Sequence, residues 1–339
     1  MAPTKWITAV LAGCLSSSVL AAPTATTDNL IVKRASINDA ASGYASQNGG
    51  TTGGAGGTTT TVSSYAAFTS AVSGDAKKVV VVSGTITQTA DQAHVGSNTS
   101  IIGKDSSAKL VNFGILVKKA SNVIIRNLGI SKVLAANGDA IGIQYSNNVW
   151  VDHCDVSSDR DHNKDYYDGL IDVSSILPNE YRISMITHAA DYVTVSNTYL
   201  HDHWKASLIG HSDSNGAEDT GHLHVTQNNN YWHNINSRTP SIRFGTGHIY
   251  NSYFDTVNDG INTRDGAQVL VESNTFVGSS EPLYSTDAGY AVARDNDFGG
   301  ASNTAEAGTL TSVPYSYTLV GSGSVKSAVV GTAGQTLTF

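Results

Sequence analysis

The sequence predicts an all-β protein with the fold of a single-stranded parallel β-helix, and three observations predict it. Short segments rich in Val and Ile, each followed by Asn or another polar turn residue, recur through most of the chain. The shorter intervals between copies are about 21 to 26 residues, a period typical of solenoids. These intervals are too short for the crossover helices that join parallel strands in ordinary sheets. Stacked coils would bury the inward apolar side chains of each coil on the next one.

The repeated segments follow one plan, in which a strand leads to a polar corner and then to another strand. The clear copies are residues 122–128, 148–154, 192–198, 247–252, 268–274 and 291–296. Asn suits a corner because it tolerates left-handed backbone angles and can stack in ladders. A β-sandwich of similar short strands is the alternative, and the regular period favours the β-helix. The longer interval between Val156 and Tyr192 is expected to hold extra strands or an excursion from the coils.

Segments outside the repeats have local signals of their own. Residues 49–57 are rich in Gly and Thr and predict a loop. Ser64 is a suitable N-cap for a short helix over residues 65–71. The β-branched run of residues 78–86 predicts a strand. The tail from about residue 303 to residue 339 matches no motif, and we expect it to pack along the β-helix or to cap its end.

The N-terminus has the features of a secretory signal peptide. Lys5 precedes an apolar stretch that is too short to span a bilayer, and small residues precede a cleavage point after Ala21. Lys33 and Arg34 form a dibasic pair that would end a propeptide of residues 22–34. We therefore expect residues 1–21 to be a signal peptide, residues 35–339 to form one β-helical domain, and the protein to be secreted and extracellular.

The charge balance limits the classes of partner. Lys and Arg total 20 against 28 Asp and Glu, so the formal net charge is −8. This balance argues against nucleic acid, because phosphate binding needs a basic face. No run after the leader approaches a transmembrane length, so we expect no membrane partner, and we expect a monomer. A polyanionic substrate still fits if a few cations gather in one place.

Cysteine content and one sequon complete the picture of a secreted chain. Cys14 would leave with the signal peptide, so Cys154 has no disulfide partner, and we expect it to be a small buried residue. A secreted protein without disulfides needs another source of stability, such as a long hydrogen-bonded core. Asn98 begins an Asn-Thr-Ser sequence and is the candidate N-glycosylation site.

Three acids predict a calcium site. Asp139 lies at the start of a predicted strand, and Asp168 and Asp172 follow about one longer coil later. Residues four apart in a strand point to the same face, so Asp168 and Asp172 would converge, with Asp139 one coil below. Several hard oxygen ligands suit Ca²⁺, and no His or Cys set has zinc spacing. Each acid alone is better explained as a turn-forming residue, whereas the three together favour calcium.

A small basic set accompanies these acids. Lys205 is expected at the start of a strand, and Arg238 and Arg243 lie five residues apart. Solvated charges paired with nearby Asp are the alternative explanation. A chain with so few Lys and Arg residues has few to spare for paired surface charge. A Lys and two Arg on successive coils beside calcium would instead make a carboxylate-binding groove.

The chain resembles family 1 of the polysaccharide lyases, the pectate and pectin lyases. The matching motifs are Gly56-Gly57, Gly138 to Ile141, Val149 to His153, Asp168 to Asp172, Val193 to Ser196, Lys205, Arg238 to Arg243, and Gly260 to Arg264. They occur in the family's order and span about residues 49–300. No single motif is decisive, but unrelated proteins would not share the ordered set.

The resemblance implies a right-handed parallel β-helix with its site on the outer face of one sheet. It implies a calcium-dependent pectate lyase that cleaves polygalacturonate internally by β-elimination. Asp139, Asp168 and Asp172 would bind Ca²⁺, and Asn137 stands where relatives often have a further Asp. Arg238 would take the proton from C5 of a galacturonate residue. The substrate carboxylates would be bound by Lys205, Arg243 and Arg264.

Three other functions remain as alternatives. A pectin lyase acts on methyl-esterified chains without calcium, and the three retained acids argue against it. A β-helical polygalacturonase would use a pair of carboxyl groups as acid and base, for which Asp168 and Asp172 are candidates. It would not need the Lys and the two Arg. A non-catalytic wall-binding solenoid is disfavoured by the clustered charge.

His153 is expected to be a hydrogen-bonded structural residue, whereas Trp204 and Tyr231 are expected either to stack on sugar or to pack in the core.

Overall fold

The structure is a computed structural model that describes Met1, residues 35–174 and residues 190–339. The predicted signal peptide, apart from Met1, and the predicted propeptide lie outside the described residues. Residues 35–174 and 190–339 belong to one compact unit. None of the helices in the described ranges has the length and apolar character needed to cross a membrane.

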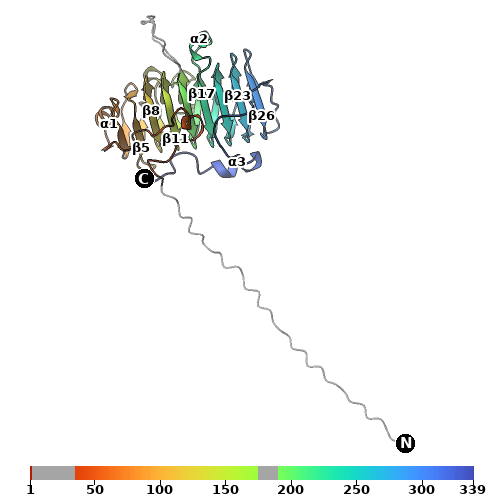
Figure 1. Cartoon of the computed structure of the whole chain (residues 1–339), viewed down its shortest axis with the longest axis horizontal. Helices are drawn as coiled ribbons and strands as arrows, with labels where there is room; N and C mark the ends of the chain where they lie inside the picture. Colours follow the sequence, from red (N-terminus) through yellow and green to blue (C-terminus); the bar gives the residue numbers. More distant parts are fainter. Residues whose placement is uncertain (2–34, 175–189) are drawn as a thin grey trace. The chain divides into compact units, whose positions relative to one another are not determined.

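Three parallel sheets, A, B and C, run along the described coils, and a typical coil adds one strand to each of them (Figure 1). Sheet A holds β1 (Thr58–Val62), β2 (Lys78–Val82), β5 (Thr99–Gly103), β8 (Ser121–Arg126), β11 (Asn147–Asp152), β14 (Asp191–Ser196), β17 (His224–Asn228), β20 (Thr246–Tyr250), β23 (Gln268–Glu272), β26 (Tyr290–Arg294) and β27 (Glu306–Ala307). Sheet B holds β3 (Thr85–Thr87), β6 (Lys109–Val111), β9 (Gly129–Ser131), β12 (Asp155–Ser157), β15 (Tyr199–Lys205), β18 (Tyr231–Ser237), β21 (Tyr253–Val257) and β24 (Thr275–Val277). Sheet C holds β4 (Ala93–Val95), β7 (Ile115–Lys118), β10 (Ile141–Gln144), β13 (Ile171–Ser174), β16 (Leu208–Ile209), β19 (Ser241–Arg243), β22 (Asp259–Arg264) and β25 (Glu281–Ser285). The predicted parallel β-helix is confirmed.

The repeats seen in the sequence are the strands of sheet A. All six copies fall on strands of this sheet, and Val149 of β11 pairs with Val193 of β14 in register. The next strand, β17, continues the register, because Val193 pairs with Val225. Sequence reasoning missed β17, since Val225 is the only strongly β-forming apolar residue between His224 and Asn228.

Asn residues form several of the bends that follow the strands of sheet A, at the same place in successive coils. The residue after a sheet A strand has a positive φ at Asn127, Asn197, Asn229 and Asn251, with values of 56°, 48°, 54° and 51°. Asn tolerates this left-handed region better than most residues. Further along the bend, one Asn in each of several coils bonds to the next coil, as where the Asn274 Nδ2 donates to the Asn296 Oδ1 at 2.9 Å. The predicted corner role of Asn is therefore confirmed.

The interior is a continuous apolar column that extends through the coils. Trp232, Phe254 and Phe276 lie on successive coils, and their rings stack with interplanar angles of 5°. All three side chains have no exposed surface. Cys154 is also fully buried, as predicted, and burial raises the pKa of its thiol to about 12. Extensive burial of this kind stabilises a chain whose one cysteine in the described residues is free.

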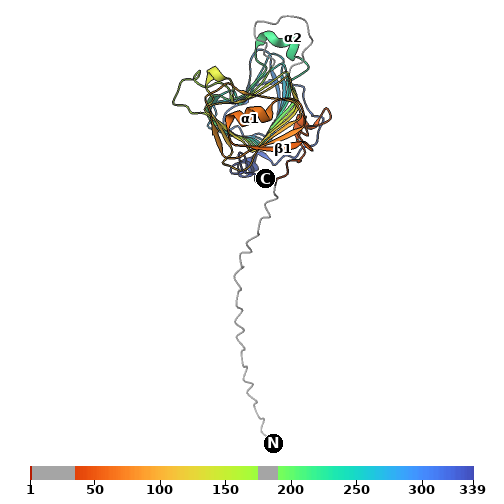
Figure 2. The same cartoon turned by 90° about the vertical axis from the view of Figure 1, so that its left-hand side faces the viewer.

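A short helix covers the end of the first coil. This helix, α1 (Tyr65–Val72), lies across the end of the coil stack (Figure 2). Its Ser64 cap accepts a hydrogen bond from the Ala67 N–H at 3.4 Å, and Phe68 and Val72 are fully buried. The predicted helix and the predicted Gly-rich loop are both confirmed. The single strand expected over residues 78–86 is wrong, because a turn at Ser83 and Gly84 divides it into β2 and β3.

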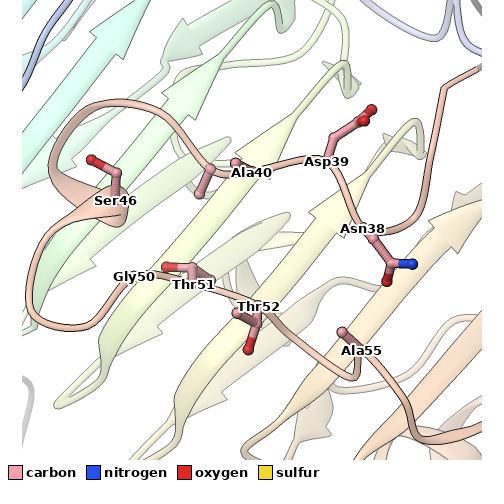
Figure 3. A pocket seen from close by; sticks show the side chains of 9 residues that line it. Asn38, Asp39, Ala40, Ser46, Gly50, Thr51, Thr52 and Ala55 are labelled. Carbon is pink, nitrogen blue, oxygen red and sulfur yellow. The ribbon is translucent and has the colours of Figure 1, made fainter.

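An N-terminal arm, residues 35–57, lies against the outer face of sheet A. It contains η1 (Gly43–Ser46), where the Ala45 N–H donates to the Thr194 hydroxyl at 3.0 Å. The arm borders a pocket of about 260 Å³, lined by Asn38 to Ala41, Ser46, Gly50 to Thr52 and Ala55 (Figure 3). None of the predicted site residues lines this pocket, so the candidate chemistry lies elsewhere.

The C-terminal tail packs along the coils, as predicted. Tyr315 contacts sheet A, where its hydroxyl bonds to Thr226 at 2.6 Å and to the His248 Nδ1 at 2.9 Å. The following helix, α3 (Ser322–Val329), lies beside sheet B, where Val325 packs on Tyr253 (Figure 1). The C-terminal tail therefore covers part of sheet A and part of sheet B, whereas sheet C carries the predicted site.

Candidate active site

The predicted site residues gather on the outer face of sheet C and at its border with sheet B. Asp139 lies two residues before the start of β10, and Asp172 lies in the next strand, β13, paired in register with Gly142. Arg243 and Arg264 end the strands β19 and β22 and are register partners. These side chains define a charged track on sheet C, with an acidic part at β10 and β13 and a basic part at β19 and β22, and the intervening strand β16 carries no charged side chain.

Asp139 and Asp172 converge on Gly169. The Gly169 N–H donates to the Asp139 Oδ1 at 3.0 Å, and the Leu208 N–H donates to the Asp172 Oδ1 at 2.9 Å. A Cβ atom on Gly169 would lie 2.6 Å from the Asp172 Oδ1 and 2.9 Å from the Asp139 Oδ1. The two carboxylate oxygens therefore face one small space that only glycine leaves open.

These two carboxyl groups are costly to ionise where they stand. Burial raises the pKa of Asp139 well above its usual range, and the charges of Asp172 and Asp168 raise it further. Burial also raises the pKa of Asp172 to about 7, although the Leu208 N–H and Arg238 act in the opposite direction. Close, buried carboxylates of this kind call for a compensating cation.

Asp168 joins this pair from outside the strand. The prediction that Asp168 and Asp172 share one strand face is wrong, because β13 begins at Ile171 and Asp168 lies in the segment before it. Asp168 nevertheless lies close enough to raise the pKa of both Asp139 and Asp172. Among the described residues, no three acidic, His or Cys side chains converge tightly enough to chelate a metal as they stand.

Asn137 and Gln92 complete the surroundings of Asp139. Asn137 ends η2 (Ala135–Asn137), and the buried Nδ2 of its amide has no hydrogen-bond partner among the described residues. The Gln92 Nε2 donates to the Asp139 backbone carbonyl at 2.8 Å and fixes the turn before β10. The site thus contains a rigid acid and an unsatisfied amide two residues before it.

Lys205 lies at the opposite end of its strand from where it was expected. It is the last residue of β15 rather than the first residue of a strand. Its Nζ pairs with the Asp165 Oδ1 at 3.0 Å, and Asp165 is in the excursion between β12 and β13. Lys205 also lies near the acids, because its positive charge lowers the pKa of Asp172.

Arg238 lies in the turn between β18 and β19. Its φ is 60°, and the Thr239–Pro240 peptide bond after it is cis. Its positive charge acts to lower the pKa of both Asp139 and Asp172, which shows that the guanidinium lies near the carboxyl pair. Within residues 35–174 and 190–339, no hydrogen bond or ion pair holds this guanidinium, unlike those of the two predicted substrate-binding arginines.

Arg243 and Arg264 form one ion-pair network. Asp213, which begins η3 (Asp213–Asn215), bridges them, with its Oδ1 2.5 Å from the Arg243 Nε and 3.5 Å from an Arg264 amino nitrogen. Asp265 lies 3.2 Å from the Arg243 Nε, and Asp287 lies 3.2 Å from Arg264. After Asp213 the chain forms α2 (Gly216–Asp219).

The other residues considered from the sequence have structural partners. The His153 Nδ1 lies 2.8 Å from the Asp152 Oδ2, as expected of a structural histidine. Tyr231 stacks on Tyr199 of sheet B and packs beside α3, so it belongs to a small core. The Trp204 ring carries a guanidinium 4.6 Å above it, that of Arg160.

Asn98, the predicted glycosylation site, is only partly exposed and already bonded. Its Nδ2 donates to the Asp75 carbonyl at 3.1 Å, and its Oδ1 accepts from Asn122 at 3.0 Å. The amide nitrogen that would carry a sugar therefore stabilises a corner between coils.

Sequence reasoning missed the acids that pair with the predicted cations. These acids are Asp165, Asp213, Asp265 and Asp287, which share no motif, and their pairing appears only once the coils are stacked. Pairing of these cations with nearby Asp was the alternative explanation considered from the sequence. The structure shows that this pairing and a charged track coexist.

Comparison with known proteins gives a consistent answer. A family model described as pectate lyase matches residues 4–337. A probable pectate lyase A of Neosartorya fischeri is 74% identical over 99% of this chain and 100% of its own length. Pectate lyase A of Aspergillus niger is 72% identical over 99% of both chains.

Solved structures agree with these relatives. A pectate lyase from Bacillus sp. N165, solved in complex with trigalacturonate, is 33% identical, with a TM-score of 0.74 over 87% of this chain and 98% of its own. The cedar pollen allergen Jun a 1 has a TM-score of 0.69 over 87% of this chain and 92% of its own. At 21% identity that likeness concerns the fold alone. The chain therefore belongs to the pectate lyase family and is an enzyme of the lyase class.

Proposed function

We propose that this chain is a secreted, calcium-dependent pectate lyase that cleaves polygalacturonate internally by β-elimination. One observation carries the proposal: two buried carboxylates face a common space at Gly169, and a guanidinium without a described partner lies beside them. A cation held by the acids and a nearby base are the two components that elimination from a uronate requires.

The donor set fits calcium. Asp139 and Asp172 supply buried carboxylate oxygens, and Asp168 supplies a less buried one from the segment before β13. Asn137 adds an unsatisfied buried amide, whose nitrogen and oxygen positions are interchangeable by rotation. Hard oxygen ligands in flexible geometry are the preference of Ca²⁺. When bound beside these residues, calcium would supply positive charge that makes the C5 proton of a uronate more acidic.

The residues of this chain would then divide the chemistry as follows. Arg238 takes the proton from C5, and the electron pair left on C5 forms the C4–C5 double bond as the C4–oxygen bond breaks. Lys205 and Arg243 hold carboxylates of the substrate, and Arg264 extends this contact by one coil. Water supplies the proton for the leaving oxygen.

The proposal of secretion rests on the leader. The first residues carry the features of a signal peptide. We expect signal removal after Ala21 and processing after Arg34, which would leave Ala35 as the N-terminus. Mass spectrometry of the secreted protein measures both cleavage sites and the occupancy of Asn98.

An ultraviolet assay tests the activity and its calcium requirement. Cleavage of polygalacturonate by elimination creates an absorbing unsaturated sugar end, whereas hydrolysis creates reducing ends without that absorbance. We expect absorbance that disappears after thorough chelation and returns with added Ca²⁺. Full activity after chelation would refute the calcium role. A rapid fall in viscosity at low conversion would support internal cleavage.

The base is tested by Arg238→Ala, with Arg294→Ala as the matched control. Arg294 lies on sheet A, is 45% exposed and pairs with Glu272, away from the track on sheet C. We expect Arg238→Ala to lose at least about a hundredfold in kcat, in the range usual for a general base. Arg294→Ala should keep wild-type kcat. Retained activity in the Arg238→Ala protein would refute this assignment.

A further inference from the structure

Asp213 is shared by two arginines that lie along the charged track. Its Oδ1 lies 2.5 Å from the Arg243 Nε and 3.5 Å from an Arg264 amino nitrogen. Arg243 and Arg264 are register partners on adjacent strands of sheet C. One carboxylate between two guanidinium groups has the same chemistry as a uronate carboxylate bound at that point.

Asp213 and Asp287 are the exposed acids of the network, and of these two only Asp213 contacts both arginines. Its side chain is 63% exposed, whereas those of Asp265 and Arg243 are 16% and 11% exposed. An exposed ion pair is weak, because water solvates the charges almost as well as the partner does. Asp213 is therefore an acid shared by both arginines that can leave the network at small cost.

Both arginines keep another acceptor when Asp213 leaves. Arg243 retains Asp265 at 3.2 Å and the Gly210 carbonyl at 3.1 Å, and Arg264 retains Asp287 at 3.2 Å. Their positions thus do not depend on Asp213. Three acids also surround two arginines, and the nearby charge of Asp213 adds to burial in raising the pKa of Asp265. The cluster has more negative charge than its arginines need.

We propose that Asp213 is a specificity-determining residue that occupies Arg243 and Arg264 in the free enzyme and is displaced by a substrate carboxylate. This inference rests on the proposed function, because it takes these arginines as substrate-binding residues. A free uronate carboxylate can replace Asp213, since it offers the same charge and oxygens. Asp213 thereby acts as an internal competitor that weakens binding of short or sparsely charged chains.

The test is Asp213→Asn, with Asp39→Asn as the matched control. Asp39 also pairs with an arginine, Arg126 at 2.9 Å, but it lies in the arm against sheet A. We expect Asp213→Asn to lower KM for polygalacturonate about two- to fivefold at low salt, with kcat unchanged. The difference should shrink at about 0.5 M salt, because exposed charges are screened. Asp39→Asn should leave KM unchanged.

The opposite results overturn the proposal. A raised KM would mean that Asp213 positions the arginines, and an unchanged KM would mean that it does not compete with substrate. A lowered KM that is insensitive to salt would point to a steric effect and would also refute displacement. Thermal unfolding midpoints of both variants show whether each is folded. Failure of the proposed function would appear differently, as a wild-type protein without lyase activity on polygalacturonate.

Discussion

Gly169 offers a direct way to disturb the carboxyl pair without removing a charge. In a Gly169→Ala protein, the new methyl group would lie 2.6 Å from the Asp172 Oδ1 and 2.9 Å from the Asp139 Oδ1. An ordinary contact is at least 3.4 Å, so the two oxygens must retreat by about 0.8 and 0.5 Å. The backbone at Gly169 is not in the left-handed region, so lack of space is the main constraint on alanine.

These shifts are large compared with the tolerance of a calcium site. Calcium–oxygen bonds span only about 2.3 to 2.6 Å, and overpacking by one methyl group typically costs about 1–3 kcal/mol. If most of that cost falls on the loaded site, calcium affinity should weaken about 5- to 150-fold. The proposed role of Asp139 and Asp172 thus predicts a defect that excess calcium overcomes in part.

Calorimetric titration with Ca²⁺ measures this effect, and lyase activity as a function of free Ca²⁺ gives an independent readout. Gly323→Ala is the matched control, because Gly323 lies in α3 with no atom within 4 Å of the position that its new methyl group would take. We expect Gly323→Ala to bind calcium as the wild type does. A Gly169→Ala protein with wild-type calcium affinity and activity would refute the assignment of Asp139 and Asp172 as ligands.

Three further predictions concern stability. Phe254→Ala should lower the free energy of unfolding by about 3–5 kcal/mol in denaturant titration, because the ring is fully buried in the aromatic stack, whereas Val277→Ala at an exposed site should change it by less than about 0.5 kcal/mol. Arg126→Ala should cost about 3–5 kcal/mol, because it leaves the buried Asp152 carboxylate, 2.7 Å away, without its arginine; a midpoint equal to wild type would contradict this. Burial lowers the pKa of His203 and His248 to about 4, below the value of about 6.5 expected when unfolded. Acid therefore favours the unfolded chain through these two histidines, whereas the raised pKa values of Asp139 and Asp172 act in the opposite direction. The unfolding temperature of a His248→Gln protein should therefore fall less steeply than that of the wild type from pH 6.5 toward pH 4, and equal slopes would refute this cause.

The sequence predicted the coils best where each residue repeats the same task. Val149 and Val193 hold equivalent positions in sheet A, and Asn127 and Asn197 hold equivalent corners, so local chemistry alone reveals them. Strand β17 escaped notice because its tertiary neighbours, rather than its own composition, hold it in the sheet.

The sequence predicted which residues belong to the site, but not where all of them lie relative to the strands. Asp168 and Lys205 were assigned to the wrong parts of strands, because strand ends are set by where each coil turns, and the sequence shows this poorly. The partners of the cations were missed for a different reason. Asp213 and Arg264 are 51 residues apart in the chain and meet only because the coils stack.

The helix α1 bears on a hazard that every solenoid faces. The first strands of the three sheets, β1, β3 and β4, have edges that no earlier strand pairs with in the described chain. An open coil end would offer these edges, together with apolar side chains, to the last coil of another molecule, and such head-to-tail contacts can continue into fibres. By burying Phe68 and Val72 over this opening, α1 makes the first coil a poor template, which favours a protein that stays dispersed at high concentration.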